Sequence, residues 1–260
     1  MTRPDPAAGV FETIRVEHGH TLCLPAHLAR LRSSVRALYG VEVGGELEAC
    51  VTGALRAARD DGSQRLRIVI TPPTAPEASL APLGAAASWG AVTLGPWTLA
   101  GGLGGHKWVD RRFLDEASER LGATPLIVEP DGEVLEAAWG NVWALEGRRL
   151  TTPPADGRLL PGVTRARLLG LAGELHLEVV EEPLSLDRLA RADAIFVTSA
   201  LRMAVPVRLE PGPGADRDEL VGWIAAALRE RALQCSVSNP KSGRKGDQRR
   251  EQDRPGTRRR

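Results

Sequence analysis

Three segments in the middle of the chain decide how the sequence is read: residues 106–112 are HKWVDRR, residues 133–143 are EVLEAAWGNVW, and residues 160–165 are LPGVTR. Lys107 follows a segment with four glycines in five residues and precedes a predicted helix. Glu136 lies on a short apolar segment that predicts a strand. Gly162 directly precedes another predicted helix, whose first N–H groups would point toward an anion.

The residues before this centre predict a small α/β unit. Its expected elements are a strand at 9–16, a return strand at 21–24, helices at 25–39 and 46–59, and a strand at 66–70. The segment 72–87 is rich in proline and alanine, which favours a linker. We therefore expect a first domain over residues 1–80 that ends in this linker.

A larger domain is expected over residues 81–236. Its expected strands lie at 91–94, 126–129, 134–136, 142–145, 150–152, 178–180, 194–198 and 204–207, and its expected helices at 111–121, 164–171, 184–189 and 218–233. Pro206 indicates that the strand at 204–207 lies at a sheet edge. The tail, 237–260, has almost no apolar residues, so we expect it to be disordered. The predicted fold class is thus α/β (α+β) with two domains.

Charge and cysteine content narrow the function classes. The tail carries nine Lys/Arg and three Asp/Glu, a net +6, so the other 236 residues carry −5 of the formal +1. A mildly acidic body gives no support for nucleic-acid binding. Three widely spaced cysteines argue against a disulfide framework or a zinc site, and His18 and His20 read as a turn rather than a metal site. With no apolar run of 18 residues, we expect a cytoplasmic protein without a membrane segment.

The three central segments together suit pyridoxal phosphate. That cofactor needs an amine for its aldehyde, an anion for its pyridinium nitrogen and a cradle for its phosphate. Lys107, Glu136 and the amides of Val163 and Thr164 would supply them in turn. Each feature has an ordinary alternative when taken alone: a solvated lysine, an edge-strand glutamate facing water, and a simple capped helix. Their joint order and spacing is the informative observation.

That order resembles the class IV pyridoxal-phosphate aminotransferases, also called fold type IV. The family includes branched-chain aminotransferases, D-amino-acid aminotransferases and 4-amino-4-deoxychorismate lyases. The resemblance covers about Gly9 to Val207. It rests on the segment 9–16, His27-x-x-Arg30-Leu31, Lys107-x-x-Asp110-Arg111, Glu136 with Asn141 five residues on, the segment 160–165, and Thr198-Ser199-Ala200-Leu201 before Val205-Pro206-Val207.

The resemblance implies a role for each matching residue. Lys107 would bind the cofactor's aldehyde as a Schiff base, and Glu136 would pair with its ring nitrogen. The implied phosphate contacts are the Arg30 side chain, the backbone amides of Val163 and Thr164, and a second pair at Ser199 and Ala200. Arg15 and Arg202 are candidates to hold substrate carboxylates, with an exposed salt bridge as the alternative for each. The family's homodimers imply a homodimer here, acting on a small amino substrate.

Two reactions remain open within the family. Lys107-x-x-Asp110-Arg111 is similar to the lyase motif, and Arg112 stands where branched-chain enzymes tend to have tyrosine. We therefore favour 4-amino-4-deoxychorismate lyase, which forms 4-aminobenzoate and pyruvate in folate biosynthesis. The alternative is a branched-chain or D-amino-acid aminotransferase that uses 2-oxoglutarate. A binding module that uses the same fold without catalysis is disfavoured, because Lys107 and Glu136 are both intact.

Overall fold

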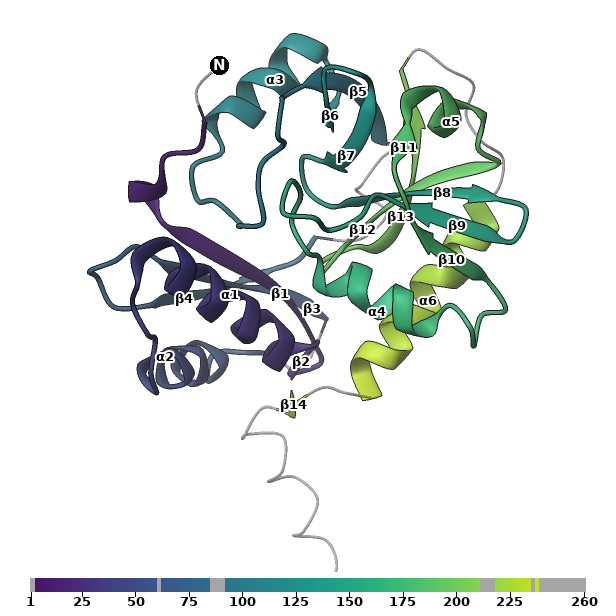
Figure 1. Cartoon of the computed structure of the whole chain (residues 1–260). Helices are drawn as coiled ribbons and strands as arrows, with labels where there is room; N and C mark the ends of the chain where they lie inside the picture. The colour runs from purple at the N-terminus through teal and green to yellow at the C-terminus, as the bar shows by residue number, and fades with distance from the viewer. Residues whose placement is uncertain (1–2, 60–61, 85–91, 211–217, 235–236, 239–260) are drawn as a thin grey trace, which may run out of the picture.

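The computed structural model describes residues 3–59, 62–84, 92–210, 218–234 and 237–238. Its strands form two sheets, one of five strands and one of nine, with helices packed against them (Figure 1). This arrangement confirms the predicted α/β fold class. Among the described helices, none combines the length and the apolar character that crossing a membrane requires.

The smaller sheet is built around one long central strand. Its unit consists of the turn η1 (Pro6–Ala8), the strands β1 (Val10–Glu17), β2 (His20–Thr21), β3 (Ser63–Ile70), β4 (Glu77–Pro82) and β14 (Val237–Ser238), and the helices α1 (Leu24–Tyr39) and α2 (Glu46–Leu55). The strand order is β14-β2-β1-β3-β4. Helix α1 begins with Pro25 in its first turn and ends at Gly40, which adopts the left-handed φ of 66° common at helix C-termini. The core between helices and sheet includes Ile14, Leu31, Val35 and Leu66.

The expected linker at 72–87 is only partly a linker. Residues Glu77–Pro82 form β4, which pairs antiparallel with β3. Proline and alanine mislead here because β4 is the outermost strand, and an edge strand tolerates proline since its N–H groups need not all be paired. The chain therefore leaves the smaller sheet after Pro82. Residues 85–91 of the expected linker lie outside the described residues.

The predicted boundary of the tail also needs correction. Val237 and Ser238 form β14, which pairs antiparallel with Thr21 and His20 of β2. The backbone of β2 offers hydrogen bonds that do not depend on side-chain hydrophobicity, so composition gave no signal for this pairing. The remainder of the expected tail, 239–260, lies outside the described residues.

The larger unit is built on the nine-stranded sheet. Its strands are β5 (Val92–Thr98), β6 (Thr124–Val128), β7 (Glu133–Ala137), β8 (Asn141–Glu146), β9 (Arg149–Thr152), β10 (Glu178–Glu181), β11 (Leu184–Ser185), β12 (Ala194–Ser199) and β13 (Met203–Leu209), and its helices are α3 (Arg112–Leu121), α4 (Val163–Leu171), α5 (Leu186–Arg191) and α6 (Asp218–Gln234). The strand order is β10-β9-β8-β12-β13-β5-β6-β7-β11. Trp143 of β8 and Phe196 of β12 stack in the core with ring centroids 5.9 Å apart.

Pro206 does not mark a sheet edge, as the sequence indicated. It lies in β13, between β12 and β5. Pro206 pairs with Phe196 of β12, whereas β5 begins to pair with β13 only at Val207. Among the described residues, Pro206 has a strand neighbour on one side only, so its missing N–H breaks no described ladder hydrogen bond.

Candidate active site

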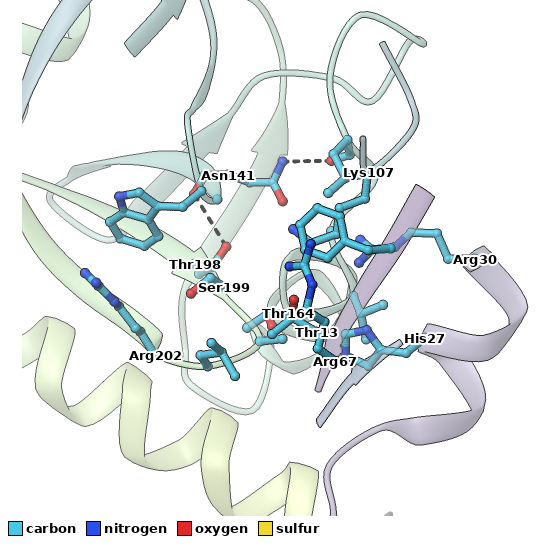
Figure 2. A pocket seen from close by; sticks show the side chains of 18 of the residues that line it. Thr13, His27, Arg30, Arg67, Lys107, Asn141, Thr164, Thr198, Ser199 and Arg202 are labelled. Carbon is cyan, nitrogen blue, oxygen red and sulfur yellow. Dashed lines mark hydrogen bonds between the residues drawn. The ribbon is translucent and has the colours of Figure 1, made fainter. Parts of the chain in front are cut away.

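A cavity of about 320 Å³ lies where the smaller and larger units meet. The smaller unit lines it from β1, α1 and β3. The larger unit contributes Lys107, the turn between β7 and β8, the start of α4 and the turn between β12 and β13. Figure 2 shows Thr13, His27, Arg30 and Arg67 on one side of this cavity and Asn141, Thr198, Ser199 and Arg202 on the other. The cavity thus joins residues that are far apart in the sequence.

Lys107 is held in the cavity by backbone pairing with β1. The Phe11 N–H donates to the Lys107 carbonyl at 2.9 Å, and the Val109 N–H donates to the Gly9 carbonyl at 3.0 Å. The Lys107 ammonium lies 4.8 Å from the centre of the Phe11 ring. Burial, and then the positive charge of Arg30, lowers the pKa of Lys107 to about 8. About a tenth of this amine is therefore unprotonated at pH 7 and available as a nucleophile.

Glu136 lies close by, on β7. It lines a smaller adjoining cavity, which shares Lys107, Arg111, Trp139, Gly140 and Leu160 with the first. The side chain is buried, and among the described residues its one hydrogen bond comes from the Leu160 N–H at 3.2 Å. Burial raises the pKa of Glu136 to about 8, and the Leu160 N–H and the charge of Lys107 offset only part of that rise. Such a carboxyl group can either keep its proton or pair with a cationic ligand.

The start of α4 lines the larger of the two cavities, which we call the main cavity. Gly162 precedes the helix in an extended conformation, and none of the described side chains caps the first amides, which include those of Val163 and Thr164. A Cβ on Gly162 would lie 2.0 Å from Oδ1 of Asn141, so only glycine fits. The Asn141 amide in turn donates to the Leu160 carbonyl at 2.9 Å. The helix start therefore presents uncapped N–H groups to the cavity, as an anion site requires.

Arg30 is fixed beside this helix start by a carboxylate that sequence reasoning did not single out. Its Nε and Nη2 donate to the two oxygens of Glu12 at 2.7 and 2.9 Å, and its Nη1 donates to the Pro161 carbonyl at 2.9 Å. His27 Nδ1 lies 2.8 Å from the same carboxylate. Burial would raise the pKa of Glu12, but His27 and Arg30 outweigh it and lower the pKa to about 2. Burial lowers the pKa of His27, so the ring is neutral and donates to Glu12.

Glu12 carried a weak signal in the sequence. It is an acid within an alternating strand, flanked by Phe11 and Thr13. That pattern is also typical of a strand whose polar face meets water. The distinguishing fact is its contact with a helix that begins at Leu24, and strand periodicity alone does not predict which helix covers which strand.

Three arginines line the main cavity in addition to Arg30. The Arg67 guanidinium lies 3.9 Å from the centre of the Phe11 ring, and that of Arg202 lies 4.6 Å from the Trp139 ring. Arg111 donates to the carbonyl of Ala138. Burial, together with the charges of Arg65 and Arg111, lowers the pKa of Arg67, and burial also lowers that of Arg202. An anionic ligand would relieve this concentration of positive charge.

The two predicted substrate arginines differ in position. Arg202 lines the cavity, but Arg15 does not. Arg15 instead pairs with Glu17 and donates to the carbonyl of Leu201 and to Ser63. The sequence did not single out Arg67 as a residue of the site. Arg65 and Arg67 are two residues apart, which places both on one face of β3.

The second predicted phosphate-binding pair also lines the cavity. Ser199 ends β12, and Ala200 begins the turn to β13. The preceding residue, Thr198, is buried and accepts a hydrogen bond from the Trp143 indole at 2.9 Å. This contact anchors the start of the turn to the core. No cluster of three potential metal ligands occurs among the residues described.

The chain matches a family model described as "Amino-transferase class IV" over residues 9–209. A putative branched-chain-amino-acid aminotransferase from Methanocaldococcus jannaschii is 35% identical over 105 residues, which cover 40% of this chain and 36% of the relative. A hypothetical aminotransferase from Mycobacterium tuberculosis, solved with α-ketoglutarate and PMP, has a TM-score of 0.74 at 22% identity and covers 90% of this chain and 93% of its own. A putative 4-amino-4-deoxychorismate lyase from Legionella pneumophila has a TM-score of 0.70 at 22% identity over 86% of this chain and 91% of its own.

Proposed function

The chain belongs to the class IV aminotransferase family, whose members are pyridoxal-phosphate enzymes, and on that premise we propose that it converts 4-amino-4-deoxychorismate to 4-aminobenzoate and pyruvate. One observation carries the assignment of its reactive residues. The half-buried Lys107 and the buried Glu136 both line the smaller of the two adjoining cavities, and desolvation moves the pKa of each toward about 8. A partly desolvated amine and a buried acid that line one cavity are the pair that this cofactor needs.

The residues present fit the three groups of the cofactor that need a partner, which are its aldehyde, its ring nitrogen and its phosphate. Lys107 offers an amine, Glu136 offers a carboxyl group that forms no ion pair among the described residues, and α4 offers uncapped amides beside Arg30. When bound, the cofactor supplies an aldehyde that bonds reversibly to amines and a ring that withdraws electrons from the substrate's Cα. We propose that the phosphate lies between Arg30, the amides of Val163 and Thr164, and the Ser199–Ala200 turn.

The chain's own residues then perform two tasks. Lys107 moves a proton at the substrate's Cα, and a pKa of about 8 lets it both accept and release that proton near neutral pH. Glu136 keeps a proton on the ring nitrogen, because a buried carboxylate is stabilised by a cationic N–H beside it. Neither task requires a metal ion.

Two of the arginines that line the cavity are candidates to bind the carboxylates of the substrate. Arg67 beside Phe11 and Arg202 beside Trp139 lie on different units and line the same cavity. A substrate with two carboxylates would match two guanidinium groups that line one cavity. 4-Amino-4-deoxychorismate has this chemistry, and the Lys107-x-x-Asp110-Arg111 motif and the fold of the Legionella protein agree with it.

Amino transfer to 2-oxoglutarate is the second candidate. It is favoured by the Methanocaldococcus relative, whose name is that of a branched-chain aminotransferase. Its alignment spans only about a third of that relative's length, and 2-oxoglutarate is also a dicarboxylate. The cavity arginines therefore do not separate the two reactions, whereas the products do.

The experiment uses protein reconstituted with pyridoxal phosphate. Incubation with 4-amino-4-deoxychorismate should release pyruvate and 4-aminobenzoate in equal amounts, measured by a coupled dehydrogenase assay and by fluorescence. In parallel, L-leucine or D-alanine is offered with 2-oxoglutarate, and glutamate is measured. Glutamate formation without pyruvate release from the first substrate would replace the lyase proposal by the aminotransferase. The Lys107→Ala variant is the blank for both assays.

A further inference from the structure

Arg15 connects three segments that are distant in the sequence. It lies on β1, and its Nε donates to Glu17 on the same strand. Its Nη2 donates to Ser63 Oγ, at the start of β3, at 3.1 Å. Its Nη1 donates to the carbonyl of Leu201, which belongs to the larger unit. One guanidinium therefore joins the smaller sheet to the turn between β12 and β13.

Glu17 anchors this arginine and adds a second link to the larger unit. Its side chain is completely buried, and its other oxygen accepts a hydrogen bond from Arg229 of α6 at 2.7 Å. A buried carboxylate needs such partners, because an unpaired charge in this position would be strongly destabilising. We call Arg15, Glu17 and Arg229 the inter-unit bridge.

The turn that the bridge holds is the one that lines the cavity. Ser199 pairs with Met203 across the β12–β13 hairpin, so Ala200, Leu201 and Arg202 form its loop. Met203 has a φ of 59°, a left-handed conformation that side chains other than glycine rarely adopt. Such a conformation persists only where the surroundings enforce it. The hydrogen bond from Arg15 to Leu201 is one contact that does so from outside the hairpin.

We propose that Arg15 is a positioning residue, which holds the Ser199–Arg202 turn so that the backbone of Ser199 and Ala200 faces the phosphate of the cofactor. This inference rests on the proposed function, since it assigns that turn to the phosphate. Arg15 itself does not touch the cavity. Its effect on binding is therefore indirect and passes through the Leu201 carbonyl.

The test compares two ligands that differ only in the phosphate. Pyridoxal phosphate and unphosphorylated pyridoxal are titrated into the protein, and the dissociation constants are obtained from visible absorbance. The variants are Arg15→Gln and Arg15→Lys, with Arg208→Gln as the matched control. Arg208 is an exposed arginine on β13, the strand that follows the same turn. Circular dichroism and thermal melting report whether each variant is folded.

Arg15→Gln should weaken pyridoxal phosphate binding by about tenfold or more, the size expected for the loss of a charge-assisted hydrogen bond. Pyridoxal binding should change by less than about threefold, because pyridoxal has no group for the turn to hold. Arg208→Gln should resemble the wild type for both ligands. Arg15→Lys should fall between wild type and Arg15→Gln, because one ammonium cannot serve both Glu17 and Leu201.

Two results would overturn the proposal. One is unchanged pyridoxal phosphate binding in a folded Arg15 variant, and the other is an equal loss for both ligands. If Arg15→Gln does not fold, Arg15→Lys decides the matter by the same ratio of the two constants, since it keeps a cation opposite Glu17. If the wild type bound neither ligand, the proposed function itself would fail, which is a different outcome.

Discussion

The half-buried Lys107 and the buried Glu136 line the same small cavity, and desolvation drives their pKa values toward each other, from 10.5 and 4.5 to about 8 in both cases. Their mutual attraction favours the charged forms, yet it is a minor influence on each residue. Both groups therefore titrate near neutral pH. This relationship is the physical basis of the predictions for both residues.

Lys107→Ala should abolish turnover and the visible absorbance of the lysine-bound cofactor. A positioned acid–base alone contributes roughly 10²–10⁴-fold, and the covalent attachment point is lost as well. The phosphate contacts at Arg30 and the α4 amides remain, so pyridoxal phosphate should still bind, although more weakly. Borohydride reduction followed by peptide mass spectrometry should place the label on Lys107 in the wild type. Labelling at Lys241 or Lys245, the only other lysines, would contradict the assignment.

Glu136→Gln should change how the stability of the cofactor-free protein depends on pH. Between pH 4.5 and about 8, the folded wild type retains the Glu136 proton that the unfolded chain has released, so its stability falls as the pH rises through this window. The glutamine variant lacks this loss. The variant should therefore gain on the wild type between pH 5 and 8, by a few kcal/mol in order of magnitude.

Urea unfolding at a series of pH values measures this difference. Glu116→Gln, on the exposed face of α3, is the control and should follow the wild type. Lys107 changes the pH dependence of the unfolding free energy only above this window. Its folded pKa of about 8 lies below the unfolded value of 10.5. Between those two values the unfolded chain holds the Lys107 proton that the folded protein has released, so the stability of the protein rises with pH. Parallel curves for wild type and Glu136→Gln from pH 5 to 8 would show that Glu136 ionises normally.

Glu12→Gln should destabilise the protein and weaken pyridoxal phosphate binding together. The Glu12 carboxylate is buried and receives hydrogen bonds from His27 and Arg30. Breaking a buried ion pair on one side costs about 3–5 kcal/mol, and glutamine recovers only part of it. Glu48→Gln is the matched control, since Glu48 of α2 pairs at the surface with Arg32 of α1, the helix that carries Arg30, and such surface pairs contribute roughly 0–1 kcal/mol. Equal effects of the two substitutions in urea unfolding would contradict the role of Glu12.

The sequence predicted the fold class, the family and the cofactor, and these are confirmed. Local patterns such as the proline and glycine that bound α1 indicated the elements, and the resemblance carried by Lys107, Glu136 and the 160–165 segment implied the family and its cofactor. The structure also brings Arg30, Val163, Thr164, Ser199, Ala200 and Arg202 to one cavity. Their individual roles stay predictions.

What the sequence did not predict depends on contacts between distant segments. Arg15 was expected at the substrate, but Glu17, Ser63 and Leu201 hold it outside the cavity. Arg67 was overlooked because an arginine on an alternating strand usually faces water. The proline and alanine content of residues 72–87 likewise predicted a linker where the edge strand β4 lies. Periodicity indicates which face of an element is buried, but it does not identify the segment that covers that face.

We predict a homodimer. The family resemblance is the main reason, and the six tryptophans are consistent with buried contacts between subunits. Light scattering of the cofactor-loaded protein should give about twice the chain mass of 27.9 kDa. A monomer that still turns over substrate would refute this prediction.

Arg67→Gln should raise KM far more than it lowers kcat. Arg67 lines the cavity against Phe11, and among the described residues no carboxylate is paired with it. It is therefore available to a substrate carboxylate, and a contact made equally in the ground state and the transition state affects KM alone. Losing a charge-assisted hydrogen bond corresponds to an increase of about 10–100-fold. Arg65→Gln is the matched control, because Arg65 is exposed on the same strand. Steady-state kinetics with whichever substrate the product assays identify measures both constants. A fall in kcat at constant KM would place Arg67 in the chemical step instead, and unchanged kinetics would remove it from the substrate site.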